Sequence, residues 1–307
     1  MTNTFPVALV QATPQLFDLA GSLERVADWT ARAAGRGAKL VLFPETFLPA
    51  YPRGLSFGTV VGSRSATGRE DWLVYFSNAV TVPGPATERL GAIAAEHQVW
   101  LVIGVTERSL TGGTLYCTLL YFNPEGELVQ KHRKLKPTGS ERILWGEGRG
   151  DDLQVVDTKY GSMGGLICWE NYMPLARMAL YEQGVSIYLA PTADHRDSWL
   201  ASMQHIACEG RCFVLACNQF VRKRDYPGRF QEELAPQPEV MTRGGSVIVS
   251  PLGEVLAGPL YGQEGLVEAE LDLKLLAKSK MDFDATGHYQ RPDVFSFHWP
   301  GSSGNFS

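Results

Sequence analysis

The chain has 307 residues, of which 44% are hydrophobic and 20% are charged, as is usual for a folded globular protein. Its 28 basic and 33 acidic side chains give a formal net charge of −5, and no apolar run approaches the roughly 18 residues of a membrane span. Because nucleic-acid binding normally needs a basic face, we expect neither nucleic acid nor a membrane as a partner. The opening segment MTNTFPVALVQA has no basic residue ahead of its apolar stretch, so we expect a cytoplasmic protein.

Apolar runs and helical spacings alternate along the whole chain. They predict buried strands at 6–11, 38–43, 100–105, 161–168, 185–191, 212–218 and 266–271, and hairpins over 115–132 and 245–258. About five helices are expected, one of them N-capped by Ser22 and others after Pro85, near 174–183 and over 197–210. The segment 51–80 is weakly patterned and is predicted to be a long loop. With no linker or repeat, we predict one α/β domain over 1–300 and a disordered tail at 301–307.

The five cysteines are odd in number and form no CxxC pair, so a disulfide framework is not expected. Four of them lie inside apolar stretches and are predicted to be small buried hydrophobes. Cys168 differs, because it ends the segment MGGLIC just before a predicted helix. Backbone N–H groups and the positive end of the helix dipole favour a thiolate there, and a thiolate attacks electrophilic carbon.

Two charged residues also follow predicted strands. Glu45 comes directly after AKLVLF, at the strand end where α/β proteins bind ligands, and burial would raise its pKa toward that of a general base. Lys134 lies in HRKLKPT, where an ammonium could stabilise developing negative charge. Taken singly, a helix cap or a rim salt bridge explains Glu45 equally well, and an inert buried thiol explains Cys168 equally well. For Lys134 alone, a surface lysine is the default interpretation. Their joint occurrence with Cys168 favours an enzyme site.

Three other short motifs resemble functional sites, but the segments around them do not fit those sites. The GLSFG segment at 54–58 fits a nucleophile elbow, but no strand precedes it and no helix follows. The basic cluster at 131–134 is predicted to be a solvated strand edge, because the protein is acidic. Cys208 and Cys212 are four residues apart at an apolar helix end, which favours core packing over a zinc site.

Three segments together resemble the nitrilase superfamily of carbon–nitrogen hydrolases. They are PETF at 44–47, HRKLKPT at 132–138 with Glu141 following, and GGLICWEN at 164–171. The CWEN sequence, IYLAPTADHRDSW at 187–199 and GHYQRP at 287–292 are similar to the nitrilase branch, and RKRDYP at 222–227 to its plant-type and arylacetonitrile-type members. The resemblance extends over nearly the whole chain.

The resemblance implies a four-layer αββα sandwich that pairs into homodimers and larger homo-oligomers. It places the nucleophile at Cys168, the proton acceptor at Glu45, the intermediate-stabilising lysine at Lys134 and a supporting carboxylate at Glu141. No metal or organic cofactor is expected, because these side chains supply the nucleophile and the proton carriers. The expected reaction is hydrolysis of a small organic nitrile to a carboxylic acid and ammonia.

The substrate side of the site is less defined by the sequence. The candidates for substrate binding are Tyr51, Trp169, Glu170, Thr192 and Trp199, although the aromatic residues fit a core equally well. An amidase or carbamoylase of the same superfamily is the nearest alternative, since the same side chains hydrolyse amides. A non-catalytic binding or assembly protein is a remote alternative, because every proposed catalytic position holds a chemically competent residue.

Overall fold

The computed structural model describes residues 4–301. The described chain contains sixteen strands, namely β1 Thr4–Gln11, β2 Leu40–Leu42, β3 Thr59–Val60, β4 Ser63–Arg64, β5 Val80–Thr81, β6 Trp100–Arg108, β7 Leu115–Phe122, β8 Leu128–Arg133, β9 Val156–Thr158, β10 Gly161–Gly165, β11 Ile187–Thr192, β12 Phe213–Asn218, β13 Phe220–Arg222, β14 Val240–Val249, β15 Val255–Tyr261 and β16 Gly265–Asp272. Its α-helices are α1 Leu19–Gly35, α2 Ala66–Ser77, α3 Pro85–His97, α4 Pro174–Glu182, α5 Asp197–Gly210 and α6 Lys274–Ser279.

Most strands belong to two seven-stranded sheets. The first has the order β16-β1-β2-β6-β7-β8, with β5 beside β6, and the second has the order β13-β14-β12-β11-β10-β9, with β15 beside β14. The central strands β1, β2 and β6 run parallel in the first sheet, as do β10, β11 and β12 in the second. Parallel strands bring their carboxyl ends to one edge of each sheet, where α/β proteins place their ligands.

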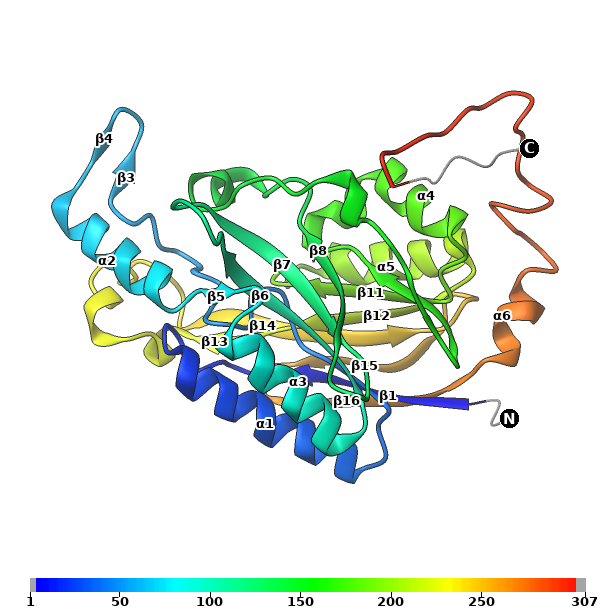
Figure 1. The fold of residues 1–307 in the computed structure, drawn as a ribbon, viewed down its shortest axis with the longest axis horizontal. Coiled ribbons are helices and arrows are strands. Elements are labelled where there is room, and N and C mark those ends of the chain that lie inside the picture. The colour runs from blue at the N-terminus through cyan, green and yellow to red at the C-terminus, as the bar shows by residue number, and fades with distance from the viewer. Residues whose placement is uncertain (1–3, 302–307) are drawn as a thin grey trace.

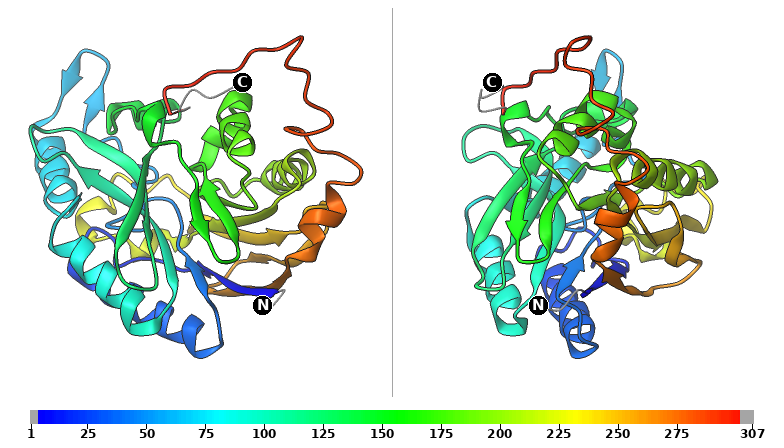
Figure 2. Two further views of the ribbon diagram at one scale, coloured as in Figure 1. Left: turned by 45° about the vertical axis from the view of Figure 1, so that its right-hand side comes forward. Right: turned by 90° about the vertical axis from the view of Figure 1, so that its right-hand side faces the viewer.

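The two sheets pack face to face, and helices cover their outer faces (Figure 1 and Figure 2). The layer between the sheets contains Leu9, Leu42 and Val102 from the first sheet and Ile187, Leu189 and Leu215 from the second. Helices α1 and α3 pack on the far face of the first sheet through Val26, Ala33, Leu90 and Ile93. Helices α4 and α5 cover the second sheet through Leu180, Met203 and Ile206. The predicted four-layer αββα sandwich is therefore confirmed.

A glycine in β6 lets the chain after β2 approach the sheet. The short strand β2 pairs with β6, and the segment that follows it carries Glu45 across β6 at Gly104. A Cβ at Gly104 would lie 2.3 Å from the Pro44 carbonyl oxygen and 2.7 Å from Glu45 Cα. No side chain fits there, so the position of Glu45 depends on this glycine.

Two predictions for the first eighty residues are wrong. Helix α1 is capped by Asp18, whose side chain accepts the Gly21 N–H, whereas Ser22 is buried inside the helix and donates to the Gln15 carbonyl. The segment 51–80 is not a plain loop: it contains the hairpin of β3 and β4 and the helix α2, which Ser65 caps. Helix α2 buries few residues and has weak apolar periodicity, so little in its sequence indicates a helix.

Smaller differences concern strand ends and cysteines. Strand β10 stops at Gly165, three residues before Cys168, and Cys208 is only half-buried. Residues 302–307, nearly all of the predicted disordered tail, lie outside the described residues. Within 4–301, no helix has the length and apolar character needed to cross a membrane.

The close approach at Gly104 predicts that Gly104→Ala destabilises the protein. The added methyl group meets backbone atoms that cannot move without displacing Glu45, so we expect the free energy of unfolding to fall by about 2 kcal/mol. Chemical denaturation followed by far-UV circular dichroism measures this change. Gly113→Ala is the matched control, because its Cβ would meet no atom within 4 Å. Equal values for the two variants would contradict the packing argument.

Candidate active site

A buried lysine joins two carboxylates at the edge of the first sheet. Lys134, one residue after β8, has a fully buried side chain, and its Nζ lies 2.7 Å from Glu45 Oε1 and 2.8 Å from Glu141 Oε2. Glu141 lies on the short 3₁₀ helix Gly139–Ile143, and its Oε2 also accepts the Thr138 N–H. The structure thus brings together three of the four catalytic candidates, from positions up to 96 residues apart in the sequence.

The charges of this group stabilise one another. Burial raises the pKa of Glu45 above its usual range, although the Lys134 ammonium opposes this rise. Burial disfavours the charged form of Lys134, but Glu45 and Glu141, together with the two neighbouring thiols, outweigh burial and raise the lysine pKa well above its usual value. The surrounding negative charges therefore favour the ammonium form of Lys134.

Cys168 begins a short 3₁₀ helix, Cys168–Tyr172, between the end of β10 and the start of α4. Its backbone has a φ of +52°, a left-handed conformation that is uncommon for a residue with a side chain. The Asn171 side chain donates to the Cys168 carbonyl oxygen, and the Thr192 hydroxyl lies 3.2 Å from Sγ. This local network fixes the direction of the thiol.

The expected stabilisation of a Cys168 thiolate is wrong. Burial raises the pKa of the Cys168 thiol, and the negative charge of Glu45 raises it further, although Lys134 opposes both effects. The N–H groups of the short 3₁₀ helix do not offset burial and the nearby carboxylate. Cys168 is therefore a protonated thiol that needs a base to remove its proton, and Glu45 is the neighbouring carboxylate.

A cavity of about 250 Å³ opens onto the Cys168 side chain. Its walls are Tyr51, Arg53, Thr138, Glu141, Cys168, Trp169, Ala193, Asp194, His195 and Arg196. Glu45 and Lys134 are fully buried behind this wall. The sequence reasoning missed the segment after β11, which supplies four of the lining residues. The signal was present, because ADHR follows the carboxyl end of a predicted buried strand, as Glu45 does.

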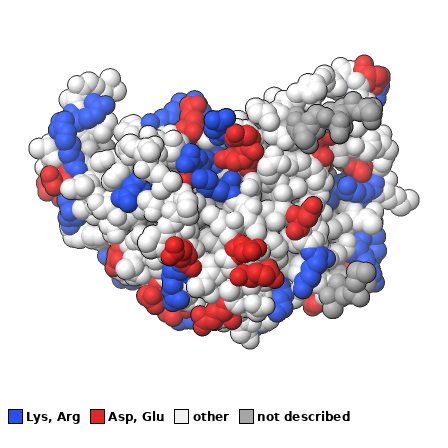
Figure 3. Space-filling view, in the orientation of Figure 1, with Lys and Arg blue, Asp and Glu red and all other residues white. Residues whose placement is uncertain are grey.

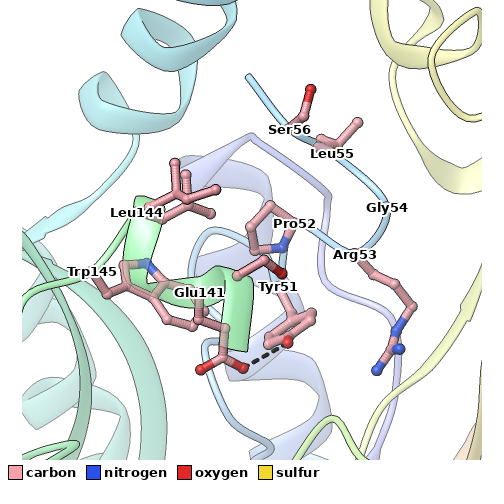
Figure 4. A pocket seen from close by; sticks show the side chains of 11 residues that line it. Tyr51, Pro52, Arg53, Gly54, Leu55, Ser56, Glu141, Leu144 and Trp145 are labelled. Atoms are coloured by element: carbon pink, nitrogen blue, oxygen red, sulfur yellow. Dashed lines mark hydrogen bonds between the residues drawn. The ribbon is translucent and has the colours of Figure 1, made fainter. Parts of the chain in front are cut away.

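A second cavity, of about 390 Å³, adjoins the first (Figure 4). The two cavities share Tyr51, Arg53 and Glu141 as wall residues. Tyr51 and Glu141 point toward each other, and the tyrosine hydroxyl donates a hydrogen bond of 2.7 Å to Glu141 Oε1 (Figure 4). Burial, with the charge of Glu141, raises the pKa of Tyr51 well above its usual value, so the phenol stays a donor.

The other substrate-binding candidates lie in three different settings. Trp169 is partly exposed on the cavity wall and donates to Asp194, and the Thr192 hydroxyl contacts the thiol. Trp199 is on α5, and its side chain is buried in the core between this helix and the second sheet, so it does not line the cavity. Glu170 also lies away from the cavity. The expectation that Trp199 and Glu170 contact the substrate therefore has no support in the geometry.

Glu170 instead joins the two loops that carry Lys134 and Cys168. Its carboxylate accepts the N–H of Leu135 at 2.5 Å and the N–H of Ile167 at 2.7 Å, each one residue from a catalytic candidate. His132 Nε2 lies 3.1 Å from the same carboxylate. Burial alone would lower the pKa of His132, but Glu170, together with Asp152, raises it to about 10. A protonated imidazole therefore compensates the buried carboxylate at neutral pH.

The basic cluster at 131–134 is not a solvated strand edge. Lys131 and Arg133 both pair with the buried carboxylate of Glu107, and His132 and Lys134 point to the other side of β8 and are buried. The alternation along the strand explains the result, since successive side chains point to opposite faces.

Comparison with known proteins agrees with this geometry. The family model described as carbon-nitrogen hydrolase matches residues 6–281. The chain belongs to the carbon–nitrogen hydrolase family.

Its curated relatives carry nitrilase names, as the resemblance in the sequence predicted. The chain is 50% identical over 301 residues to the bifunctional nitrilase/nitrile hydratase NIT4B of Nicotiana tabacum, with 96% of this chain and 86% of that protein covered. It is 49% identical over 292 residues to an aliphatic nitrilase of Sinorhizobium fredii, with 95% and 94% covered. Plant and bacterial members of the family are thus similarly close.

Solved structures of the family share the fold. Nit3 of Saccharomyces cerevisiae superposes with a TM-score of 0.74 at 23% identity, covering 94% of this chain and 97% of that one. An amidase from Nesterenkonia sp. gives a TM-score of 0.65 at 22% identity, covering 91% and 94%. At these identities the likeness concerns the fold alone.

The bridging position of Glu170 predicts a large cost for Glu170→Gln. The amide cannot accept both backbone N–H groups as the carboxylate does, and it leaves the imidazolium of His132 with Asp152 as its one acidic partner. We expect the free energy of unfolding to fall by about 3 kcal/mol, as for other broken buried ion pairs. Urea denaturation measures the loss.

Glu147→Gln is the matched control, because Glu147 pairs with Lys136 in an exposed position. It should cost at most about 1 kcal/mol. If the two substitutions cost the same, Glu170 does not hold the two loops together.

Proposed function

We propose that the protein is a nitrilase, which converts an organic nitrile and two water molecules into a carboxylic acid and ammonia through a covalent bond to Cys168. The observation that carries this proposal is the buried Glu45–Lys134–Glu141 group behind a cavity that opens onto Cys168. The chain is 50% and 49% identical in sequence to two proteins named nitrilases, over almost its whole length, and this similarity supports the same reaction.

The first step forms the bond between sulfur and carbon. Glu45 takes the proton of the Cys168 thiol, and Sγ adds to the nitrile carbon to give a thioimidate. Negative charge develops on the nitrile nitrogen, which takes up the proton that Glu45 received from Cys168, so that Glu45 becomes a carboxylate again. Lys134 stabilises that charge, because its ammonium is held at 2.7 and 2.8 Å by two carboxylates and needs no rearrangement.

The second step decides the product. Water, deprotonated by Glu45, adds to the thioimidate carbon and gives a tetrahedral intermediate that carries sulfur, oxygen and nitrogen. Loss of ammonia leaves a thioester, which a second water hydrolyses to the acid and the free thiol. Loss of the thiol instead releases an amide. The name of the Nicotiana relative, a bifunctional nitrilase/nitrile hydratase, favours amide as a second product.

The cavity also favours a class of nitrile. Its volume of about 250 Å³ suits a small molecule. Arg53 on its wall donates to the Thr242 hydroxyl and the Ala193 carbonyl, and it forms no ion pair with any carboxylate among residues 4–301. Arg196, in contrast, pairs with Asp194. We infer that Arg53 favours nitriles with an anionic substituent.

We also propose a cellular location and an oligomeric state for the enzyme. The composition and the resemblance favour a cytoplasmic enzyme without nucleic-acid or membrane partners, and acidic and basic residues are interspersed on the face in Figure 3. Exposed apolar side chains at the start of α4, namely Tyr172, Met173 and Leu175, support assembly into homodimers and larger oligomers.

Ammonia release tests the proposed function. Wild-type protein and Cys168→Ala are compared on phenylacetonitrile, benzonitrile, an aliphatic dinitrile and a cyano acid, each beside its matching amide, with acid and amide products quantified. We expect wild type to consume nitriles and Cys168→Ala to lose at least about a thousandfold in rate, because nucleophile removal ends covalent catalysis. Turnover by the variant would remove Cys168 as nucleophile, and turnover of amides alone would indicate an amidase.

The Arg53 guanidinium, which has no carboxylate partner among residues 4–301, predicts a charge preference. Wild type should use 3-cyanopropanoate better than butanenitrile in kcat/KM, and Arg53→Gln should reduce that ratio by about tenfold or more through loss of a charge-assisted hydrogen bond. Arg196→Gln is the matched control and should change the ratio less, because Asp194 already neutralises Arg196. An unchanged ratio in Arg53→Gln would show that Arg53 does not select the substrate.

A further inference from the structure

A second thiol lies against the carboxylate of Glu45. Cys117 is in β7, its side chain is buried, and its Sγ is 3.5 Å from Glu45 Oε1. A carboxylate only accepts hydrogen bonds, so the thiol is the donor in this contact. The cavity that opens onto Cys168 is not lined by Cys117. Cys117 therefore contacts the proposed base without lining the cavity.

Cys117 also contacts Lys134. Its backbone carbonyl accepts the Lys134 N–H at 2.8 Å, while Lys134 Nζ donates to the same Glu45 oxygen that accepts from the thiol. The other oxygen, Glu45 Oε2, accepts the Ala193 N–H at 3.0 Å. Together with the Cys168 thiol, which also hydrogen-bonds to Glu45, four donors surround the carboxylate, and the two thiols are the weakest of them.

The chemistry of Cys117 fits a donor and not a second nucleophile. Burial raises the pKa of the Cys117 thiol well above its usual value, and the charge of Glu45 raises it further. The sulfur therefore keeps its proton. Cys217 provides a comparison in the same buried layer: its thiol donates to the carbonyls of Val10 and Leu42 and contacts no charged group within residues 4–301.

We propose that Cys117 is a positioning residue, whose S–H hydrogen bond holds the Glu45 carboxylate in its ionised form and in the orientation that receives the Cys168 proton. This inference rests on the proposed role of Glu45 as the base.

The pH dependence of the reaction follows from the groups around Glu45. Besides Cys117, these are Lys134 after β8, Glu141 on the 3₁₀ helix, Cys168 and the more distant Tyr51. Lys134 favours the carboxylate and Glu141 disfavours it. A thiol donor also favours the carboxylate, so its removal must move the apparent pKa of the cluster, and with it the acid limb of kcat/KM, to higher pH.

The test compares Cys117→Ala, Cys117→Ser and Cys217→Ala with wild type. We expect Cys117→Ala to move the acid limb upward by about 0.5 pH unit, the effect of a weak hydrogen bond. Cys117→Ser also loses the sulfur but keeps a donor, so its limb should stay nearer to that of wild type. Cys217→Ala removes a buried thiol of the same size and should leave the limb unchanged. If Cys117→Ala does not fold, Cys117→Val is the donor-free variant.

A second readout does not depend on nitrile turnover. Alkylation of Cys168 by iodoacetamide, followed by peptide mass spectrometry over the same pH range, reports on proton removal from that thiol, and the same shift is expected in Cys117→Ala. An unmoved limb in Cys117→Ala, or equal shifts in Cys117→Ala and Cys117→Ser, or an equal shift in Cys217→Ala, would each overturn the proposal. Absence of Cys168-dependent ammonia release in wild type would overturn the proposed function instead.

Discussion

The burial of one ammonium group organises the site. Lys134 is fully removed from solvent, and a lone charge in that position would cost several kcal/mol. It is tolerated because Glu45 and Glu141 lie within 2.8 Å, and these carboxylates in turn need Lys134. The pairing of Lys134 also depends on residues outside this group. Gly104 leaves room for the segment that carries Glu45, and Glu170 accepts hydrogen bonds from both the loop of Lys134 and the loop of Cys168.

The buried ionisable groups of the site fall into two kinds, those that stay charged and those that exchange protons. Lys134 and His132 stay protonated because carboxylates surround them, so they provide a fixed electrostatic field. Glu45 and Cys168 both have raised pKa values because both are buried, so each favours its protonated form more than it would in water. Such a division suits a reaction that needs a base, then an acid, then a base again.

Short motifs were enough to predict the fold class. They also named Glu45, Lys134, Glu141 and Cys168 as catalytic candidates, whose roles stay predictions. Apolar runs located most strands, because fully buried parallel strands leave a clear pattern in sequence. The sequence-based predictions were wrong or incomplete where a property depends on residues far away in the sequence. The Cys168 pKa depends on Glu45, which is 123 positions away, and β7 presents Cys117 simply as one residue of an apolar run. Helix α2 lacks the periodic apolar face that would have revealed it.

The hydrogen bond between Tyr51 and Glu141 has a consequence for how such an enzyme diversifies. It lies on the common wall of two cavities, and only one of them reaches Cys168. Tyr51 is the aromatic residue of this shared wall, so a smaller side chain there would widen the passage between the two cavities while Glu45, Lys134, Glu141 and Cys168 stay unchanged in sequence. Substrate range and chemical competence can therefore evolve at separate positions of one scaffold.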